Sequence, residues 1–322
     1  MPIELPTRLS YSSLNMYAEC GEKWKLARGY HLDKETWFAS VAGSAIHNIT
    51  ERWDLTDTGI EILEIPTFKQ EFDRLLEIEE ANSVRIKPSG KKLLKNGPNG
   101  GPNKKDYDWW LDFGPPMIER WMQWKQASDW FLLEVTREDP TGDLVGAVIP
   151  AVELPFEVNA DGHVVRGYID RVYGRGDGKV VVLDLKTGAL PSGHLQLATY
   201  RLGLLRQYGI DADYGTYWIG KDGELTSLIE LRRYSLAYLD NLYNMAWRGI
   251  NAGIFIPNVS SMCRACPVRD YCRAVAGPKA VQLPLRDKLV QVERDDDVWV
   301  RPGVEPDAIG WSEGLTGPGE AW

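Results

Sequence analysis

The sequence predicts an α/β protein in which helices flank a mixed β-sheet. Before Phe131, apolar residues recur at helical spacing, which favours helices. From Phe131 on, short runs of β-branched and aromatic residues are separated by turn signals, which is typical of strands. A helix, two further strands and a last helix follow, and such an order is expected to pack helices against a sheet.

Helices are expected at six places along the chain. The first begins after Ser10 or Ser12, because serine is a good N-cap. The expected ranges are about 12–28, 38–53, 66–83, 116–130, 193–208 and 235–251. In the fourth helix, Trp121 and Trp124 are interpreted as core residues and not as a base-stacking surface.

Strands are expected in the region from Phe131 to about Arg233. Turn signals such as Asp161-Gly162 and Lys221-Asp222-Gly223 separate several of them. The expected strands are "FLLEVTRE", "AVELPFEVNA", "HVVRGYIDRVYG", "KVVVLDLKTG", "YGTYWIG" and "LTSLIELRR".

The composition of the chain is that of a globular protein with a sizeable core. It has 322 residues, of which 43% are hydrophobic and 26% are charged. No apolar run reaches membrane-spanning length, and "MPIELPTRLS" lacks the layout of a signal peptide. We therefore expect a cytoplasmic protein with no membrane association.

The net charge of −9 is spread unevenly. Residues 287–322 hold nine acidic and three basic residues, whereas residues 85–105 hold seven basic and no acidic ones. A local basic path could attract a phosphate backbone although the whole chain is acidic, and an ordinary solvated loop is the equal alternative. We expect one domain over residues 1–278 and an acidic, mostly irregular tail over residues 279–322.

Charged residues follow one another at the end of the buried run "VVVLDLKTG". Asp184 and Lys186 are two apart and therefore share a face of the strand, and Asp170 is expected on the neighbouring antiparallel strand. Two adjacent carboxylates repel unless a cation lies between them, and Mg²⁺ or Mn²⁺ suits oxygen ligands. His47 could add a nitrogen ligand, with Glu51 one helical turn away.

Carboxylates, a divalent metal and a lysine together can hydrolyse a phosphodiester. The metal activates water and neutralises phosphoryl oxygens, and Lys186 would orient the water or stabilise developing negative charge. A D-x-K triplet alone, however, favours an ordinary ion pair at a strand end, which contributes little.

The order of four motifs changes that conclusion. "GSAIH", "GYIDR", "LDLKTG" and "QLATY" follow one another over about 150 residues. In this order they resemble the PD-(D/E)XK nuclease superfamily, in its RecB-like branch. The resemblance implies a four- or five-stranded mixed sheet flanked by helices, as in restriction endonucleases.

The resemblance also implies a role for each matching residue. Those implied to hold Mg²⁺ or Mn²⁺ are His47, Asp170, Asp184 and the carbonyl of Leu185. Lys186 would position the attacking water, and Gln196 and Tyr200 match a Q-x-x-x-Y motif that contacts the substrate strand. Glu153 is a candidate auxiliary carboxylate, with an ordinary exposed strand glutamate as the equal alternative, and Glu51 is a weaker candidate.

The four cysteines form a second pattern. Cys263, Cys266 and Cys272 have C-x₂-C-x₅-C spacing, and Cys20 lies near the other end of the chain. Four thiolates suit either zinc or an iron–sulfur cluster, and a lone buried cysteine is the alternative for Cys20. The arrangement is similar to that of iron–sulfur nucleases, namely AddB-type helicase–nuclease subunits and RecB-like exonucleases associated with CRISPR adaptation. The resemblance implies a structural 4Fe–4S cluster that joins the N- and C-terminal segments, although Gly21 stands where the family usually has proline.

The predicted function is that of a metal-dependent exonuclease that acts on single-stranded or linear DNA ends in recombination or repair. A recombination or helicase partner and a homo-oligomer are both compatible with the sequence. The first alternative is a catalytically silent DNA-binding subunit of a recombination or CRISPR-adaptation complex. The second is a zinc-stapled structural protein with a chance D-x-K.

Overall fold

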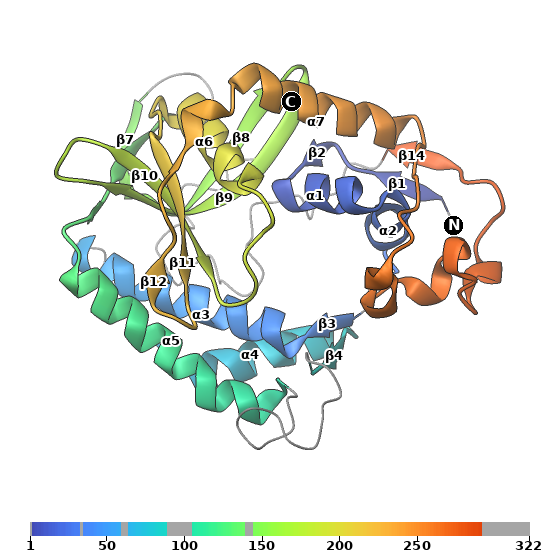
Figure 1. Cartoon of the computed structure of the whole chain (residues 1–322), viewed down its shortest axis with the longest axis horizontal. Helices are drawn as coiled ribbons and strands as arrows, with labels where there is room; N and C mark the ends of the chain where they lie inside the picture. Colours follow the sequence, from blue (N-terminus) through green and yellow to red (C-terminus); the bar gives the residue numbers. More distant parts are fainter. Residues whose placement is uncertain (1, 33–34, 59–63, 89–104, 139–143, 292–322) are drawn as a thin grey trace.

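The computed structural model describes residues 2–32, 35–58, 64–88, 105–138 and 144–291, and its centre is an eight-stranded mixed sheet (Figure 1). The long strand β9 (His163–Gly174) pairs with β2, β5, β8 and β10. The strands around it are β2 (Arg8–Leu9), β5 (Phe131–Leu132), β8 (Val152–Ala160), β10 (Val180–Lys186), β11 (Tyr214–Ile219), β12 (Glu224–Leu225) and β13 (Ile229–Glu230).

The strand that carries Asp184 and Lys186 lies inside this sheet. β10 is antiparallel to β9 and parallel to β11. Its side chains from Val181 to Leu185 are at most 1% exposed, which confirms the prediction of a buried strand. Parallel neighbours need a crossover connection, and α6 (Leu195–Tyr208) provides it.

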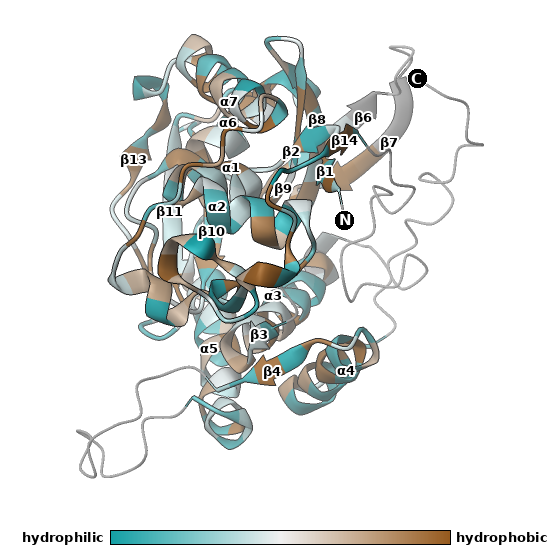
Figure 2. Ribbon diagram, turned by 90° about the vertical axis from the view of Figure 1, so that its right-hand side faces the viewer, coloured by the Kyte–Doolittle hydropathy of each residue, from teal (hydrophilic) through white to brown (hydrophobic). Residues whose placement is uncertain are grey.

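Helices cover both faces of the sheet, as predicted. The three on one face are α3 (Phe38–Leu55), α4 (Phe68–Ala81) and α5 (Tyr107–Ala127), and those on the other include α1 (Tyr11–Glu19), α6 and α7 (Leu236–Asn251). Figure 2 shows the first three together beside the β3–β4 pair. Successive residues of β10 face the two layers in turn, since Leu183 joins the core of α3–α5 and Val182 joins that of α6 and α7.

Residues near the two ends of the described chain lie side by side (Figure 1). β1 (Ile3–Leu5) pairs in parallel with β14 (Leu289–Gln291), and Tyr30 donates a hydrogen bond of 2.6 Å to Asp287. β14 falls within the tail predicted over residues 279–322, of which residues 292–322 lie outside the described residues.

The predicted basic segment forms a strand at its beginning. β4 (Arg85–Lys87) pairs in parallel with β3 (Glu35–Trp37), and the Lys87 ammonium contacts the Glu35 carboxylate. Residues 89–104 of that segment lie outside the described residues.

The prediction of one continuous helix over about residues 12–28 is wrong, because the helix is interrupted at Cys20. Cys20 has an extended backbone, with φ −165° and ψ 106°, and separates α1 from α2 (Gly21–Trp24). Its sulfur accepts a hydrogen bond of 3.4 Å from the Lys23 amide and so caps the second helix. A π-helical turn (Lys25–Gly29) follows.

The fourth predicted helix begins earlier than expected. α5 starts at Tyr107, after Asp106, which accepts a hydrogen bond of 3.2 Å from the Trp109 amide. Pro115 and Pro116 lie inside the helix, although proline is preferred in a first turn. The packing of α5 against α4 outweighs that preference, since an added Cβ on Gly114 would lie 2.4 Å from the Phe68 ring.

The last predicted strand is two short strands. β12 and β13 pair with different parts of β11, and between them Thr226 accepts a hydrogen bond of 3.0 Å from the Tyr217 amide through its side chain. Short strands that the sequence did not predict are β1, β2, β3, β4, β14 and β7 (Leu144–Pro150), the last paired with β6 (Glu134–Glu138). In the described ranges, every helix is too short or too polar to span a bilayer.

Candidate active site

An open cavity of about 400 Å³ lies where α3 passes the carboxyl end of β10. Its wall includes Gly43 and His47 from α3 and Lys186 and Thr187 from the end of β10. Gly43 permits this close approach, because an added Cβ would lie 3.0 Å from the Thr187 hydroxyl oxygen. Three of the predicted site residues, His47, Leu185 and Lys186, therefore line the same cavity.

Asp184 and Lys186 form an ion pair, and Gln196 holds both of them. Lys186 Nζ lies 2.6 Å from Asp184 Oδ2. Gln196 Nε2 donates to Asp184 Oδ1 at 2.6 Å, while Gln196 Oε1 accepts from Lys186 Nζ at 3.0 Å. The amide of Gln196 thus presents its donor to the carboxylate and its acceptor to the ammonium, which fixes both side chains.

Tyr200 joins the two aspartates. Its hydroxyl oxygen lies 3.1 Å from Asp170 Oδ1 and 3.1 Å from Asp184 Oδ1, so its single proton can go to either. Asp170 Oδ2 accepts a hydrogen bond of 3.0 Å from the Leu185 amide. The register in which Arg171 opposes Leu183 brings the aspartates together.

A second group of possible ligand atoms lies beside this cluster. His47, Glu153 and Asp170 each offer one ligand atom, and these atoms are all within 4.8 Å of one another. His47 Nδ1 is 3.5 Å from Glu153 Oε1 and 3.5 Å from Asp170 Oδ2, and its Nε2 is 3.0 Å from the Leu185 carbonyl oxygen. The imidazole therefore stands between two carboxylates and the carbonyl that the resemblance implied as a ligand.

Glu153 is buried in the structure, so the alternative of an ordinary exposed strand glutamate is wrong. Its side chain is 9% exposed, and its φ of 45° is uncommon for a residue with a side chain. In the sequence, the available signal was a single acid inside the apolar stretch "AVELPF". Glu51, the weaker candidate, is buried on α3, but in the described part of the chain the group within 4.8 Å does not include it.

Burial and the neighbouring Asp170 raise the pKa of Asp184 to about 7, although Lys186 opposes the shift. Burial lowers the pKa of Lys186, but the carboxylates of Asp184 and Asp170 outweigh burial and hold that pKa above its ordinary value. Lys186 therefore stays charged, while one of the two neighbouring carboxyls of Asp170 and Asp184 resists ionisation. A further positive charge at this place would favour the ionised form of both aspartates.

The residues present fit a hard divalent cation. Asp184 Oδ2 is buried and accepts no aligned hydrogen bond, although the Lys186 ammonium is close to it. Carboxylate oxygens, a backbone carbonyl and an imidazole nitrogen are donors that Mg²⁺ and Mn²⁺ accept. Asp184 itself is linked to the group of His47, Glu153 and Asp170 through Tyr200.

A buried arginine lies beneath this group, and its burial was not predicted from the sequence. Arg171 is 0% exposed, and its Nε lies 2.5 Å from Asp54 Oδ2, while its Nη1 lies 3.5 Å from Glu153 Oε1. Trp121 donates a hydrogen bond of 2.9 Å to the other oxygen of Asp54. An arginine within the strand "YIDRVYG" reads as solvent-facing in sequence, and only the packing of α3 and α5 over β9 encloses it.

The four predicted cysteines meet at one place. Cys20, Cys263, Cys266 and Cys272 line a single small cavity, and Lys23 and Arg269 also contribute to its wall. The amides of Lys23 and Asn258 donate to the Cys20 sulfur at 3.4 and 3.3 Å. Cys20 is therefore not a lone core cysteine.

Gly21 is required by the chain that crosses it. An added Cβ would lie 2.8 Å from the Ile256 amide nitrogen and 2.9 Å from Phe255 Cα. Proline, which the family usually has there, would bring such a Cβ. The close crossing of residues 255–256 over Cys20 and Gly21 is the local reason for this departure.

Comparisons with known proteins agree with the arrangement of these motifs. The model of the PD-(D/E)XK nuclease superfamily matches residues 8–273. The "Gene 69 protein" of Mycobacterium phage D29 is 30% identical over 289 residues, which cover 84% of this chain and 97% of the relative. The "Gene 69 protein" of Mycobacterium phage L5 is 26% identical over 83% of this chain and 96% of the relative.

One solved structure, titled "Crystal structure of SSO0001", is 13% identical with a TM-score of 0.33, and the match covers 82% of this chain and 95% of that one. The family match, in contrast, extends over most of the chain and includes every residue of the cluster around Asp184. The chain belongs to the PD-(D/E)XK nuclease superfamily.

Proposed function

We propose that this chain is a metal-dependent DNA exonuclease that hydrolyses phosphodiester bonds at the ends of single-stranded or resected linear DNA, in recombination or repair. The observation that carries the proposal is the pair Asp184–Lys186, fixed by Gln196, beside the group of His47, Glu153 and Asp170. The open cavity at this place is lined by Lys186 and His47, so a strand in it would have access to both.

In this proposal, the metal would be held by His47, Asp170, Asp184 and the Leu185 carbonyl, with Glu153 as the auxiliary carboxylate. Bound there, Mg²⁺ or Mn²⁺ would supply an activated water and neutralise charge on the phosphate. Lys186, held in its charged form, would orient the attacking water and stabilise the charge that develops on the phosphoryl oxygens. The water oxygen would form a bond to phosphorus while the bond from phosphorus to the leaving ester oxygen breaks; the water would give up one proton and the leaving oxygen would take one up, to yield a phosphate end and a hydroxyl.

The positions of Gln196 and Tyr200 support a role in alignment. Both side chains touch Asp184, and Gln196 also touches Lys186, so they keep the reacting groups at fixed distances. Positioning of this kind is a large part of the catalysis of group transfer. In this proposal the same two residues would orient the strand being cut.

The alternative is a catalytically silent DNA-binding subunit. The described site argues against it, because Asp170, Asp184 and Lys186 are all present and in contact through Tyr200 and Gln196. The action on ends, the pathway and a helicase partner rest on the resemblance to RecB-like nucleases.

The experiment is digestion of end-labelled linear DNA and of circular single-stranded DNA with Mg²⁺ or Mn²⁺. Lys186→Ala and Lys186→Arg are compared with the matched control Lys179→Ala, which removes a lysine just before the opposite end of β10. We expect wild type and the control to shorten only the linear DNA, and the Lys186 variants to be inactive. Cleavage of circular DNA would show that the enzyme is an endonuclease and not an exonuclease. Equal inactivity of all proteins would favour the catalytically silent DNA-binding subunit.

We also propose that Cys20, Cys263, Cys266 and Cys272 hold a structural 4Fe–4S cluster. The four sulfur-bearing residues line one small cavity, although Cys20 is remote from the other three in the sequence. Four thiolates at one place suit either a single zinc ion or an iron–sulfur cluster. The choice of the cluster rests on the resemblance to iron–sulfur nucleases.

The test of the cluster is the iron and acid-labile sulfide content of protein purified without oxygen. About four iron atoms and four sulfides per chain would support the cluster. Zinc without iron or sulfide would instead show that the four cysteines hold a zinc ion. Cys263→Ser should lower the iron content and the melting temperature together, because metal-binding free energy contributes to folding.

A further inference from the structure

Two aromatic side chains near the beginning of α5 form a stack on the surface of that helix. The rings of Trp109 and Phe113 lie one helical turn apart, with centroids 4.2 Å apart and planes inclined by 7°. Phe113 is 46% exposed, whereas Trp110 and Trp121 on the same helix are at most 1% exposed. The stacked pair therefore lies outside the core that Trp110 and Trp121 help to build.

A positive charge accompanies this aromatic pair. The Lys105 ammonium lies 4.8 Å from the centre of the Trp109 ring, which is a cation–π distance. In the sequence, residues 85–105 precede α5 and contain seven basic and no acidic residues. Asp108 and Asp112 are exposed on α5, but each precedes an aromatic residue of the pair by one position, which is about 100° around the helix. These acids therefore lie on a different side of α5 from the stacked rings.

The pair has the chemistry of a stacking platform for single-stranded DNA. Bases stack on aromatic side chains because every base has a π-face, and a cation beside the rings attracts the phosphate backbone. Phe113 is already stacked on Trp109, so its ring is held in one orientation while nearly half of its surface stays open. A base would therefore meet a preformed aromatic surface.

Contacts through Gly220 place the pair relative to Lys186. Gly220 follows β11, and its amide donates a hydrogen bond of 2.8 Å to the Lys186 carbonyl. An added Cβ on Gly220 would lie 3.3 Å from the sulfur of Met117 on α5, and Arg120 Nη1 donates to the Gly220 carbonyl at 3.5 Å. Phe113 precedes Met117 by one helical turn, which is about 6 Å along α5. The pair therefore lies close to the point where α5 meets the end of β10.

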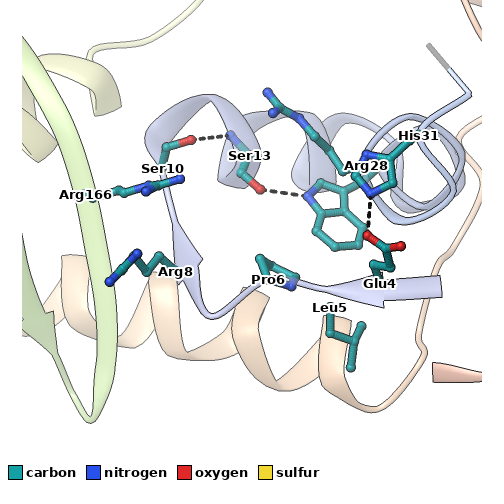
Figure 3. A pocket seen from close by; sticks show the side chains of 10 residues that line it. Glu4, Leu5, Pro6, Arg8, Ser10, Ser13, Arg28, His31 and Arg166 are labelled. Atoms are coloured by element: carbon teal, nitrogen blue, oxygen red, sulfur yellow. Dashed lines mark hydrogen bonds and ion pairs between the residues drawn. The ribbon is translucent and has the colours of Figure 1, made fainter. Parts of the chain in front are cut away.

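The polar groups of the cavity beside β1, in contrast, are engaged within the chain (Figure 3). Trp24 donates a hydrogen bond of 2.8 Å to the Ser13 hydroxyl, and Glu4 lies 3.1 Å from His31. These contacts join the segment before α1 to the turns that follow α2. The cavity therefore stabilises the N-terminal segment, and the stack on α5 is a separate surface.

We infer that the Trp109–Phe113 pair stacks a base of the DNA strand that is cut at Lys186. This inference rests on the proposed function and adds to it a contact with a base, whereas the cavity at Lys186 receives a phosphate. Stacking accepts every base, so the contact would hold the strand without regard to its sequence. It also needs an unpaired base, so it would favour single-stranded over double-stranded ends.

The test is an abasic scan of a short, labelled single strand, with binding measured in EDTA. In each strand of the series one nucleotide lacks its base, and the position of the missing base moves along the strand. Wild type is compared with Phe113→Leu, which removes the ring but keeps an apolar side chain, and with Phe113→Trp, which restores a ring. Phe131→Leu is the matched control, because Phe131 is 52% exposed and pairs with Gly174, beside the end of β10 remote from Lys186.

We expect Phe113→Leu to bind the intact strand about tenfold more weakly than wild type, because one stacked base is lost. Phe113→Trp and Phe131→Leu should bind as wild type does. One position of the scan should weaken binding to wild type by a similar factor and have no further effect on Phe113→Leu. Unchanged binding by Phe113→Leu, or the same scan profile for both proteins, would overturn the inference.

Two further measurements separate the remaining outcomes. Light scattering gives the oligomeric state of each protein, and weaker binding by Phe113→Leu together with a changed oligomeric state would assign the pair to a protein interface and overturn the inference. Metal-dependent cleavage is measured on the same proteins. If wild type cleaves DNA and Phe113→Leu binds it unchanged, the stacking contact alone is wrong. If wild type gives the expected scan without cleavage, the enzyme is wrong and the stacking site remains. Melting temperatures check that the variants are folded.

Discussion

Arg171 and Asp54 form an ion pair of 2.5 Å in which both side chains are 0% exposed. The pair lies directly beneath Glu153, which is 3.5 Å from the same guanidinium. A buried pair of this kind adds little stability compared with an apolar pair, but the loss of one partner leaves an uncompensated charge. The pair therefore supports the candidate metal site from beneath, and the loss of either partner would lower the free energy of unfolding by a large amount.

Arg171→Met should destabilise the protein by about 3–5 kcal/mol, because it leaves the Asp54 carboxyl buried without its counter-charge. Burial already raises the pKa of Asp54 even with Arg171 present. The folded variant should hold a proton on Asp54 that the unfolded chain releases, so its free energy of unfolding should fall as pH rises. Urea denaturation at pH 5 and pH 8 measures this, and the double variant Asp54→Leu/Arg171→Met should regain most of the loss. Equal stability of Arg171→Met and wild type at pH 8 would contradict the argument.

The metal-free protein should lose stability as pH rises through the titration of Asp184. Its pKa is raised to about 7 in the folded chain, above the ordinary value near 4, so between these values the folded state binds more protons than the unfolded state. The free energy of unfolding should therefore fall by about 2–4 kcal/mol from pH 4 to pH 8 through this group. Asp184→Asn should remove that part of the slope, and Mn²⁺ should stabilise wild type more at pH 8 than at pH 5. Melting curves in EDTA and in Mn²⁺ report both, and a wild-type slope retained in Asp184→Asn would speak against Asp184 as its source.

Tyr200→Phe should lower kcat by roughly 10²-fold with a smaller effect on KM, since the hydroxyl that touches Asp170 and Asp184 is lost while the ring remains. Tyr208→Phe is the matched control on the same helix, because it also removes a tyrosine hydroxyl from α6, one that donates to the Pro155 carbonyl at 2.5 Å. Steady-state cleavage of a short linear strand measures both variants. Equal rates for the two would show that Tyr200 serves packing alone.

Gly21→Ala should separate α2 from the segment that crosses it, because the new Cβ would lie 2.8 Å from the Ile256 amide nitrogen, and backbone atoms cannot move aside cheaply. We expect a loss of about 1–3 kcal/mol in the free energy of unfolding and a lower iron content. Gly176→Ala is the control, since nothing lies within 4 Å of an added Cβ there. Unchanged iron content in Gly21→Ala would show that the crossing does not support the cysteine group.

The elements that sequence predicted well are those whose pattern is long and internally consistent. β10 is a run of apolar residues that ends in Asp184 and Lys186, and α6 and α7 have helical periodicity with Gly209 and Ser235 at their limits. For these, local preference and tertiary packing agree.

The features that sequence missed depend on partners that are remote along the chain. Arg171 is buried only because α3 and α5 pack over β9, and the interruption at Cys20 follows from the crossing of residues 255–256. Two-residue strands such as β2 have too few positions for any alternation to be recognised. Within the site, the sequence could not decide whether Glu153 is an auxiliary carboxylate or an exposed strand glutamate. Its burial depends on α3 and on the positive φ at that position.

The pairing of β1 with β14 determines how this chain would respond to a stretching force. The two strands are parallel, with Ile3 beside Leu289 and Leu5 beside Gln291, so a pull on the two ends acts at opposite ends of the ladder. Its hydrogen bonds would then be loaded together in shear and would not open one after another. Tension from either end would meet this pair, and the contact of Tyr30 with Asp287 behind it, before it reached the sheet that carries Asp184.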